Sequence, residues 1–137
     1  MLSLFASQQL ILSGNKVFLL EAEQQRAQGE GDKAAASYEA AIHSAKEHRF
    51  VHEEAMSCEL AALFYLERGL QSKAYGLFSR SKACYEQWGA HAVAKRVDSD
   101  MREKLGPRLV EQYEAEAVVP EAVFAPKEDS KKRQMTE

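Results

Sequence analysis

The sequence predicts an all-α protein made of antiparallel helical hairpins that stack as a short α-solenoid. Three observations predict it: apolar residues recur at spacings of three and four, a pattern repeats after forty residues, and no stretch alternates as a strand does. The 137 residues are 45% hydrophobic and 28% charged, a composition typical of a helix-rich globular protein. We expect a helical-repeat domain over residues 1–106, then a short acidic helix and a disordered tail over residues 107–137.

Six helices are expected, over residues 3–13, 16–28, 32–48, 52–68, 71–88 and 90–105. The first and the last are expected to cover the two ends of the array, because terminal elements must shield the apolar faces of the hairpins. The fourth is apolar on nearly all sides and is therefore expected to be the central, most buried helix. The apolar side chains of the first helix are Leu2, Leu4, Phe5, Leu10, Ile11 and Leu12.

The repeat predicts two helical hairpins of the same design. In each copy a glycine is expected to end one helix in a short turn. A small residue then lets the next helix pack closely, and an aromatic residue fills the space between the helices. The matched residues are Gly29, Ala34, Tyr38 and Ala41 in the first copy, and Gly69, Ala74, Phe78 and Ser81 in the second.

The only tryptophan, Trp88, is expected on the same helix face as Phe78 and Tyr85. We therefore expect Trp88 to be a buried structural wedge, whose replacement by alanine costs about 3–5 kcal/mol. Gly89 follows it and supplies the permissive backbone needed to leave the helix. The full stripe consists of Ala74, Leu77, Phe78, Ser81, Cys84, Tyr85 and Trp88.

Charge and cysteine content narrow the function classes. A formal net charge of -3 gives no broad basic field, so nucleic acid is not an expected partner. No segment approaches the ~20 apolar residues that span a bilayer, and the N-terminal apolar run lacks the basic residues of a signal peptide. Cys58 and Cys84 are expected to be small buried thiols in a reducing, cytoplasmic compartment.

The strongest candidates for a metal site are His48 and His52, with Cys58 as a further ligand. A spacing of four places two ligands together only on one continuous helix. The repeat puts His48 at the end of one helix and His52 at the start of the next, so we expect the imidazoles to point apart. We expect no catalytic residue and no cofactor; a metal-binding or enzymatic domain centred on His48 and His52 is the alternative of another class.

Four cations give the last expected helix a basic edge: Lys95, Arg96, Arg102 and Lys104. This edge is a candidate docking surface for an acidic protein partner. If either end of the array is incompletely covered, an apolar patch is left for a protein partner or for a second copy of the chain. Both association with another protein and homo-oligomerisation therefore stay open.

The spacing of glycine, small residue and aromatic residue resembles a tetratricopeptide hairpin, although that repeat has a period of about 34 residues. A narrower match lies in EEAMSCELAALFYLERG, which includes Leu60, Ala62 and Phe64, followed by A-x3-F-x5-CYEQWGA. These residues resemble the tetratricopeptide-like helical region of hybrid sensor histidine kinases and of serine/threonine kinases with an AAA-type ATPase region.

The resemblance covers residues 16–97 and reaches no catalytic module. The ATPase of that family needs a Gly-rich phosphate-binding loop that ends in Lys-Ser or Lys-Thr, and the sequence contains none. The resemblance therefore implies a non-catalytic scaffold that works with a protein partner or with neighbouring signalling domains. The alternative within the same family is a fragment of a larger sensor kinase or ATPase protein, without an activity of its own.

Overall fold

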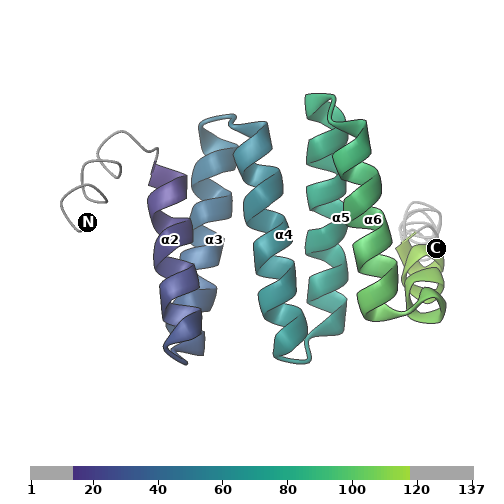
Figure 1. Cartoon of the computed structure of the whole chain (residues 1–137), viewed down its shortest axis with the longest axis horizontal. Helices are drawn as coiled ribbons and strands as arrows, with labels where there is room; N and C mark the ends of the chain where they lie inside the picture. The colour runs from purple at the N-terminus through teal and green to yellow at the C-terminus, as the bar shows by residue number, and fades with distance from the viewer. Residues whose placement is uncertain (1–13, 118–137) are drawn as a thin grey trace, which may run out of the picture.

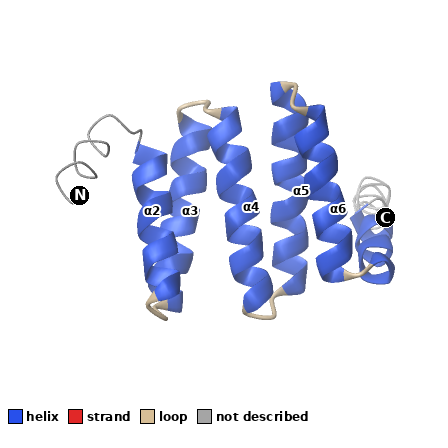
Figure 2. Ribbon diagram, viewed as in Figure 1, coloured by secondary structure: helices blue, strands red, loops and turns tan. Residues whose placement is uncertain are grey.

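The computed structural model describes residues 14–117, and every element in that range is a helix. The helices stand side by side in a row that begins with α2 (Figure 1), joined by short turns (Figure 2). Those expected between residues 16 and 105 are confirmed to within two residues at each end, whereas the expected helix over 3–13 and the tail from 118 lie outside the described residues. The elements are α2 (Gly14–Ala27), α3 (Gly31–Glu47), α4 (Val51–Glu67), α5 (Gln71–Trp88), α6 (His91–Leu105) and a further helix over residues 107–117.

The four turns that join α2 to α6 share one backbone geometry. In each, one residue adopts a left-handed conformation, and the next amide donates a hydrogen bond to the carbonyl five residues earlier, as from Leu70 to Tyr65 at 2.9 Å. This is the Schellman arrangement, which satisfies the free carbonyls at a helix end. The left-handed residues recur every twenty positions: Gly29 (φ 79°), Arg49 (φ 61°), Gly69 (φ 80°) and Gly89 (φ 91°).

The helices pack as two hairpins, because contacts are most extensive within the pairs α2–α3 and α4–α5. Small side chains at Ala34 and Ala74 are fully buried and let the helices approach. The aromatic residues expected between the helices are also buried, with Tyr38 at 0% and Phe78 at 1% exposure. The side chain of Ser81 donates a 2.7 Å hydrogen bond to a backbone carbonyl of α4 and further joins the second hairpin.

Helix α4 is central, as expected, since it contacts α2, α3 and α5. Ala62 and Phe64 are buried in the core that the hairpins share. Met56, Leu60 and Leu63, however, are only partly buried, although the sequence around them is apolar throughout. Their spacing of four and three places them on one face of α4. One apolar face of the central helix therefore remains partly open.

The helix over residues 107–117 packs onto the same core. Val110 is fully buried and belongs to the main hydrophobic cluster. The ring of Tyr113 lies 5.0 Å from that of Tyr75 on α5, and Arg102 of α6 donates a 2.7 Å hydrogen bond to Glu114. The short acidic helix expected after Gly106 is thus a packed part of the helical domain.

The prediction that Trp88 is buried is wrong. Its side chain is 56% exposed, whereas Phe78 and Tyr85 on the same stripe are 1% and 5% exposed. Trp88 is the last residue of α5, and at this level the neighbouring helix α4 has only just begun at Val51. A stripe of constant spacing continues to the end of a helix, but burial ends where the neighbouring helix ends.

Candidate functional site

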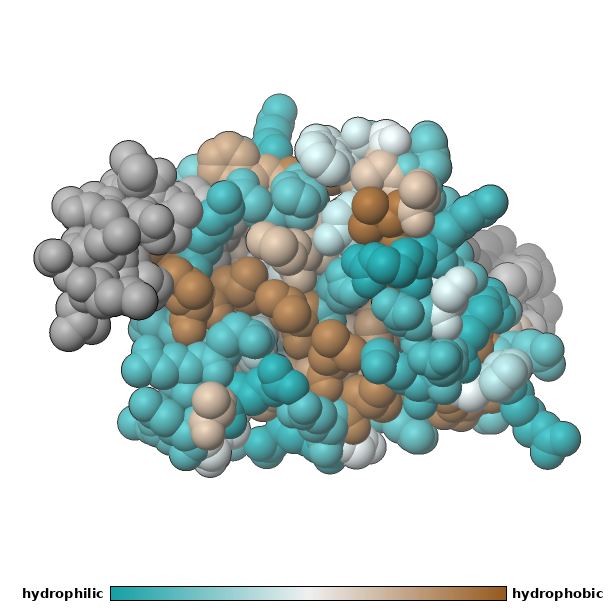
Figure 3. All heavy atoms as spheres, in the orientation of Figure 1, coloured by the Kyte–Doolittle hydropathy of each residue, from teal (hydrophilic) through white to brown (hydrophobic). Residues whose placement is uncertain are grey.

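The face formed by α2 and α4 carries a band of apolar side chains, seen across the front of the molecule in Figure 3. Within this band lies a groove of about 240 Å³. Pockets for drug-sized ligands usually measure about 300–1,000 Å³, so the groove lies below that range. We call it the α2–α4 groove; its lining residues are Lys16, Leu19, Leu20, Glu23, Met56 and Leu60.

The groove exists because α2 and α4 are alternate helices of the row. They run in the same direction, and α3 lies behind them rather than between them (Figure 1). On α2 the lining residues have the spacing of a single helix face. Leu20 and Leu60 occupy equivalent positions forty residues apart, so the repeat brings two leucines to the same open face.

The apolar face stops at α6. Forty residues after Leu60 lies Asp100 of α6, which accepts a 2.9 Å hydrogen bond from Arg96. Arg96 also donates a 2.8 Å hydrogen bond to Glu59 of α4. A charged network therefore borders the leucines on the α6 side, so that the open apolar surface is confined to α2 and α4.

Ion pairs join α2 to α4 at both ends of the groove. Lys16 lies 3.6 Å from Glu53 at one end, and Arg26 Nε donates a 2.9 Å hydrogen bond to Glu67 Oε1 at the other. The hydrogen bond from Arg26 holds the pKa of Glu67 below its usual value. These partly exposed pairs bridge the two helices on either side of the leucines.

A side chain of α3 contacts the charged edge of the groove. The hydroxyl of Tyr38 donates a hydrogen bond to Glu23, and Arg26 lies 3.5 Å from the same carboxylate. Burial, together with this hydrogen bond, raises the pKa of Tyr38. The ring of Tyr38 packs on Phe64 of α4 with centroids 5.0 Å apart. The carboxylate at the rim is therefore held in place by groups of the core.

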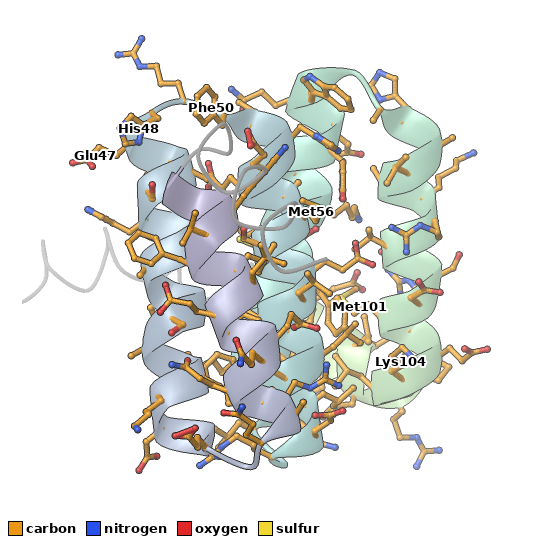
Figure 4. The ribbon with its side chains drawn as sticks, turned by 60° about the vertical axis from the view of Figure 1, so that its left-hand side comes forward. Glu47, His48, Phe50, Met56, Met101 and Lys104 are labelled. Atoms are coloured by element: carbon orange, nitrogen blue, oxygen red, sulfur yellow. The ribbon has the colours of Figure 1, made fainter. Side chains whose placement is uncertain are left out.

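The candidate metal ligands do not come together. His48 lies at the turn after α3, where its ring stacks on Phe50 (Figure 4), whereas His52 stacks on Trp88. Cys58 is fully buried, and burial raises the pKa of its thiol to about 12. Within residues 14–117, no group of three or more His, Cys, Asp or Glu side chains is placed to hold a metal ion.

The cations of α6 do not form an unpaired basic edge. Arg96 is bonded to Glu59, and Arg102 donates a 2.9 Å hydrogen bond to Asp98. Two of the four charges that were expected to attract an acidic partner are thus matched within the domain. Within residues 14–117, the two cations of that edge that are exposed without such a bond are Lys95 and Lys104.

The groove residues Leu20 and Met56 were not singled out by the sequence. For Leu20, the signal that could have identified it is the series Leu20, Leu60 and Asp100 at intervals of forty residues, which marks a face that is apolar on two helices and polar on a third. The same interval does not identify Met56, because it relates Met56 to Lys16 and Arg96. The chain matches no family model, and comparisons with curated proteins and with solved structures give no match. No helix within the described range is long and apolar enough to cross a membrane.

Proposed function

We propose that the chain is a non-catalytic protein-interaction scaffold whose α2–α4 groove binds an apolar helical segment of a protein partner. The observation that carries the proposal is the row of partly exposed Leu20, Met56 and Leu60 between two ion pairs that bridge α2 and α4. Amphipathic helices dock into apolar grooves through side chains spaced three and four residues apart. Exposed apolar surface bordered by charged groups is typical of such docking sites.

The proposal includes the stacking of the hairpins as a tetratricopeptide-like α-solenoid. It is supported by the turn that recurs every twenty residues and by the equivalence of groove positions forty residues apart. In solenoids, equivalent positions of successive repeats line one extended surface, and binding is carried by that surface. The resemblance of residues 16–97 to helical regions beside signalling kinases and ATPases favours a partner from cytoplasmic signal transduction.

A photo-crosslinking amino acid in place of Leu60 tests the proposal. In cells that express the full chain, we expect irradiation to give a discrete covalent adduct with a partner protein. The matched control carries the same amino acid in place of Leu70, which is 47% exposed on a turn outside the groove. No adduct from position 60, or the same adduct from position 70, would refute the groove as the binding site.

Single substitutions in the chain that carries the crosslinker at position 60 test whether the adduct depends on the groove itself or on α2 as a whole. Leu20→Asp is expected to abolish the adduct, because it places a charge inside the apolar groove. Gln24→Asp adds the same charge to an exposed position of α2 and is expected to leave the adduct intact. Circular dichroism of both variants verifies that they are folded. Equal effects of the two substitutions would contradict the proposal.

The partner can also be a neighbouring domain of a larger signalling protein of which this chain is a segment. In that case the adduct from position 60 is an intramolecular crosslink within the longer polypeptide. Mapping the transcript and its neighbouring coding sequence, together with the mass of the adduct, distinguishes the two arrangements.

A further inference from the structure

We propose that residues 1–13 of this same chain occupy the α2–α4 groove when no partner is bound. The inference rests on the proposed function in one respect, since it takes the groove as a docking surface for an apolar segment. It adds a regulatory relationship: a partner must displace the chain's own N-terminal segment before it can bind.

The position of residues 1–13 along the chain favours them as the occupant of the groove. Residues 1–13 directly precede α2, and the groove begins at Lys16. The lining of α2 from Lys16 to Glu23 extends over about 10 Å of helix, and a helix of thirteen residues would be about 20 Å long. An extended chain of that length reaches about twice as far. The segment is therefore long enough to turn back beside α2 and cover the whole groove.

The chemistry of the segment fits the groove. Residues 1–13 contain no charged side chain, although 28% of the whole sequence is charged. Burying an uncharged segment avoids the large cost of removing ions from water. The charged groups of the rim can also stay hydrated, since the side chains of Lys16 and Glu23 are 40% and 37% exposed. The apolar side chains that the segment offers are Leu2, Leu4, Phe5, Leu10, Ile11 and Leu12.

The C-terminal segment is a poorer occupant. It follows the helix over residues 107–117, which packs on α5 and α6 at the other end of the row. It also carries the charged run KEDSKKR over residues 127–133. To reach the groove it would have to cross the molecule, and its charges would meet the apolar lining.

A second copy of the chain competes at a disadvantage. A segment joined to the groove by a short connection has an effective local concentration of about millimolar. A separate molecule at micromolar concentration is roughly a thousandfold more dilute. Outside the groove, the exposed large hydrophobic side chains of the described domain come from different elements: Phe18 from α2, Phe50 and Leu70 from the residues just before α4 and α5, and Trp88 from the end of α5. Tethering therefore favours occupation from within the same chain.

A spin label in the segment tests the proposal in the full-length protein. Ser7→Cys supplies the attachment site, while Cys58 and Cys84 are buried and their thiol pKa values are raised. We expect the methyl signals of Leu20, Met56 and Leu60 to lose most of their intensity, and that of Leu109 on the far helix to keep it. Unchanged groove signals, or an equal loss at Leu109, would overturn the proposal.

Two full-length variants of the labelled chain provide a matched comparison. Leu4→Asp combined with Phe5→Asp is expected to restore the groove signals, because two charges no longer fit an apolar lining. Val123→Asp combined with Phe124→Asp adds the same charges to the other end of the chain and is expected to change nothing. If both variants restore the signals, the effect comes from net charge and the proposal fails.

A mixed sample identifies occupation by a second copy. Spin-labelled chain is added to isotope-labelled chain that carries no spin label, so only intermolecular contacts reduce the signals. We expect no loss in this sample; a loss equal to that within one chain would replace the intramolecular arrangement with a dimer. The partner adduct from position 60 is a separate readout: its absence refutes the proposed function alone, whereas unchanged groove signals refute occupation by residues 1–13 alone.

Discussion

His52 in the first turn of α4 stacks on Trp88 at the end of α5, with ring centroids 4.4 Å apart and ring planes inclined by 19°. The indole is 56% exposed, so this contact is an aromatic pair at the surface. Such pairs contribute about 0.5–1.5 kcal/mol beyond the area they bury. The only tryptophan of the chain therefore joins the beginning of one helix to the end of the next without being part of the core.

Trp88→Ala is expected to lower the free energy of unfolding by about 1 kcal/mol, the scale of a surface aromatic pair. Phe78→Ala, at a side chain that is 1% exposed, is expected to cost about 3–5 kcal/mol. Urea denaturation followed by far-ultraviolet circular dichroism measures both variants. Equal losses would show that Trp88 is packed as tightly in solution as Phe78.

Arg49→Gly is expected to raise the free energy of unfolding by about 0.5–1 kcal/mol. Arg49 has a φ of 61°, a left-handed conformation that costs a side-chain-bearing residue about 1–2 kcal/mol and glycine almost nothing. The reverse change, Gly69→Ala, is expected to destabilise by a similar amount, since a Cβ at Gly69 meets no atom within 4 Å and only the backbone is strained. Thermal and urea denaturation check both; a less stable Arg49→Gly protein would mean that the arginine side chain outweighs the strain.

Ser57→Ala and Ser81→Ala remove the same hydroxyl group with opposite expected effects. The Oγ of Ser57 is buried without a hydrogen-bond partner, so its removal is expected to stabilise the protein by about 1 kcal/mol. The Oγ of Ser81 donates to the carbonyl of Ala55 at 2.7 Å, so its removal is expected to cost about 0.5–1.5 kcal/mol. Denaturant midpoints of the two variants decide the matter, and a shift in the same direction for both would contradict this account.

Lowering the pH is expected to weaken the contact between α5 and α6, because it protonates the carboxylate of Asp98. Burial alone would raise the pKa of Asp98, but hydrogen bonds from Arg102 at 2.9 Å and Lys82 at 3.2 Å outweigh it and hold the pKa below 3.8. Because the folded pKa is lower than the unfolded one, this stabilisation is present above the unfolded pKa and is lost as the pH falls through the folded pKa. Asp98→Asn should therefore cost about 0.5–1 kcal/mol at neutral pH, and progressively less as the pH falls through the folded pKa of Asp98.

The control for Asp98 is Asp32→Asn, the same substitution at a fully exposed side chain. We expect it to change the free energy of unfolding by less than about 0.5 kcal/mol at neutral pH. Unfolding curves recorded at several pH values give the comparison. An Asp98→Asn protein with the same pH dependence as the parent would exclude this carboxylate as a source of acid sensitivity.

Both thiols are expected to be unreactive in the folded protein. Burial raises the pKa of Cys58 to about 12 and that of Cys84 to about 11, so little thiolate is present near pH 8. A thiol-specific chromogenic disulfide should react with neither residue in the native state and with both in guanidinium. Rapid reaction of one thiol in native buffer would show that its part of the core opens without global unfolding.

The helices and the glycine turns could be predicted from the sequence because both depend on nearby residues. The spacing of Ala74, Phe78 and Ser81 and the position of Gly69 are local patterns, and the structure follows them. The twenty-residue turn period was missed because arginine occupies the second of the four left-handed positions, whereas glycine occupies the other three. Propensity alone does not predict a left-handed arginine.

The exposure of Trp88 and the existence of the groove depend on how far apart the helices lie. The spacing of residues along the sequence does not predict these distances. Trp88 continues the stripe of its helix beyond the cover of the neighbouring helix. Leu20 and Met56 line a groove between α2 and α4, two helices that are also bridged by ion pairs between residues 37 and 41 positions apart along the chain. These pairings are tertiary contacts, and no short motif records them.

The recurrence of one turn at residues 29, 49, 69 and 89 determines how such a chain can change its length. A forty-residue unit that starts and ends on the same kind of turn can be inserted or removed with little change to the backbone on either side, because both junctions offer a left-handed residue and the same hydrogen-bond pattern. Duplication of residues 50–89 would add one more helix parallel to α4, with its own methionine and leucine on the open face. Growth by whole hairpins is therefore the low-strain route by which this protein would acquire a longer apolar surface.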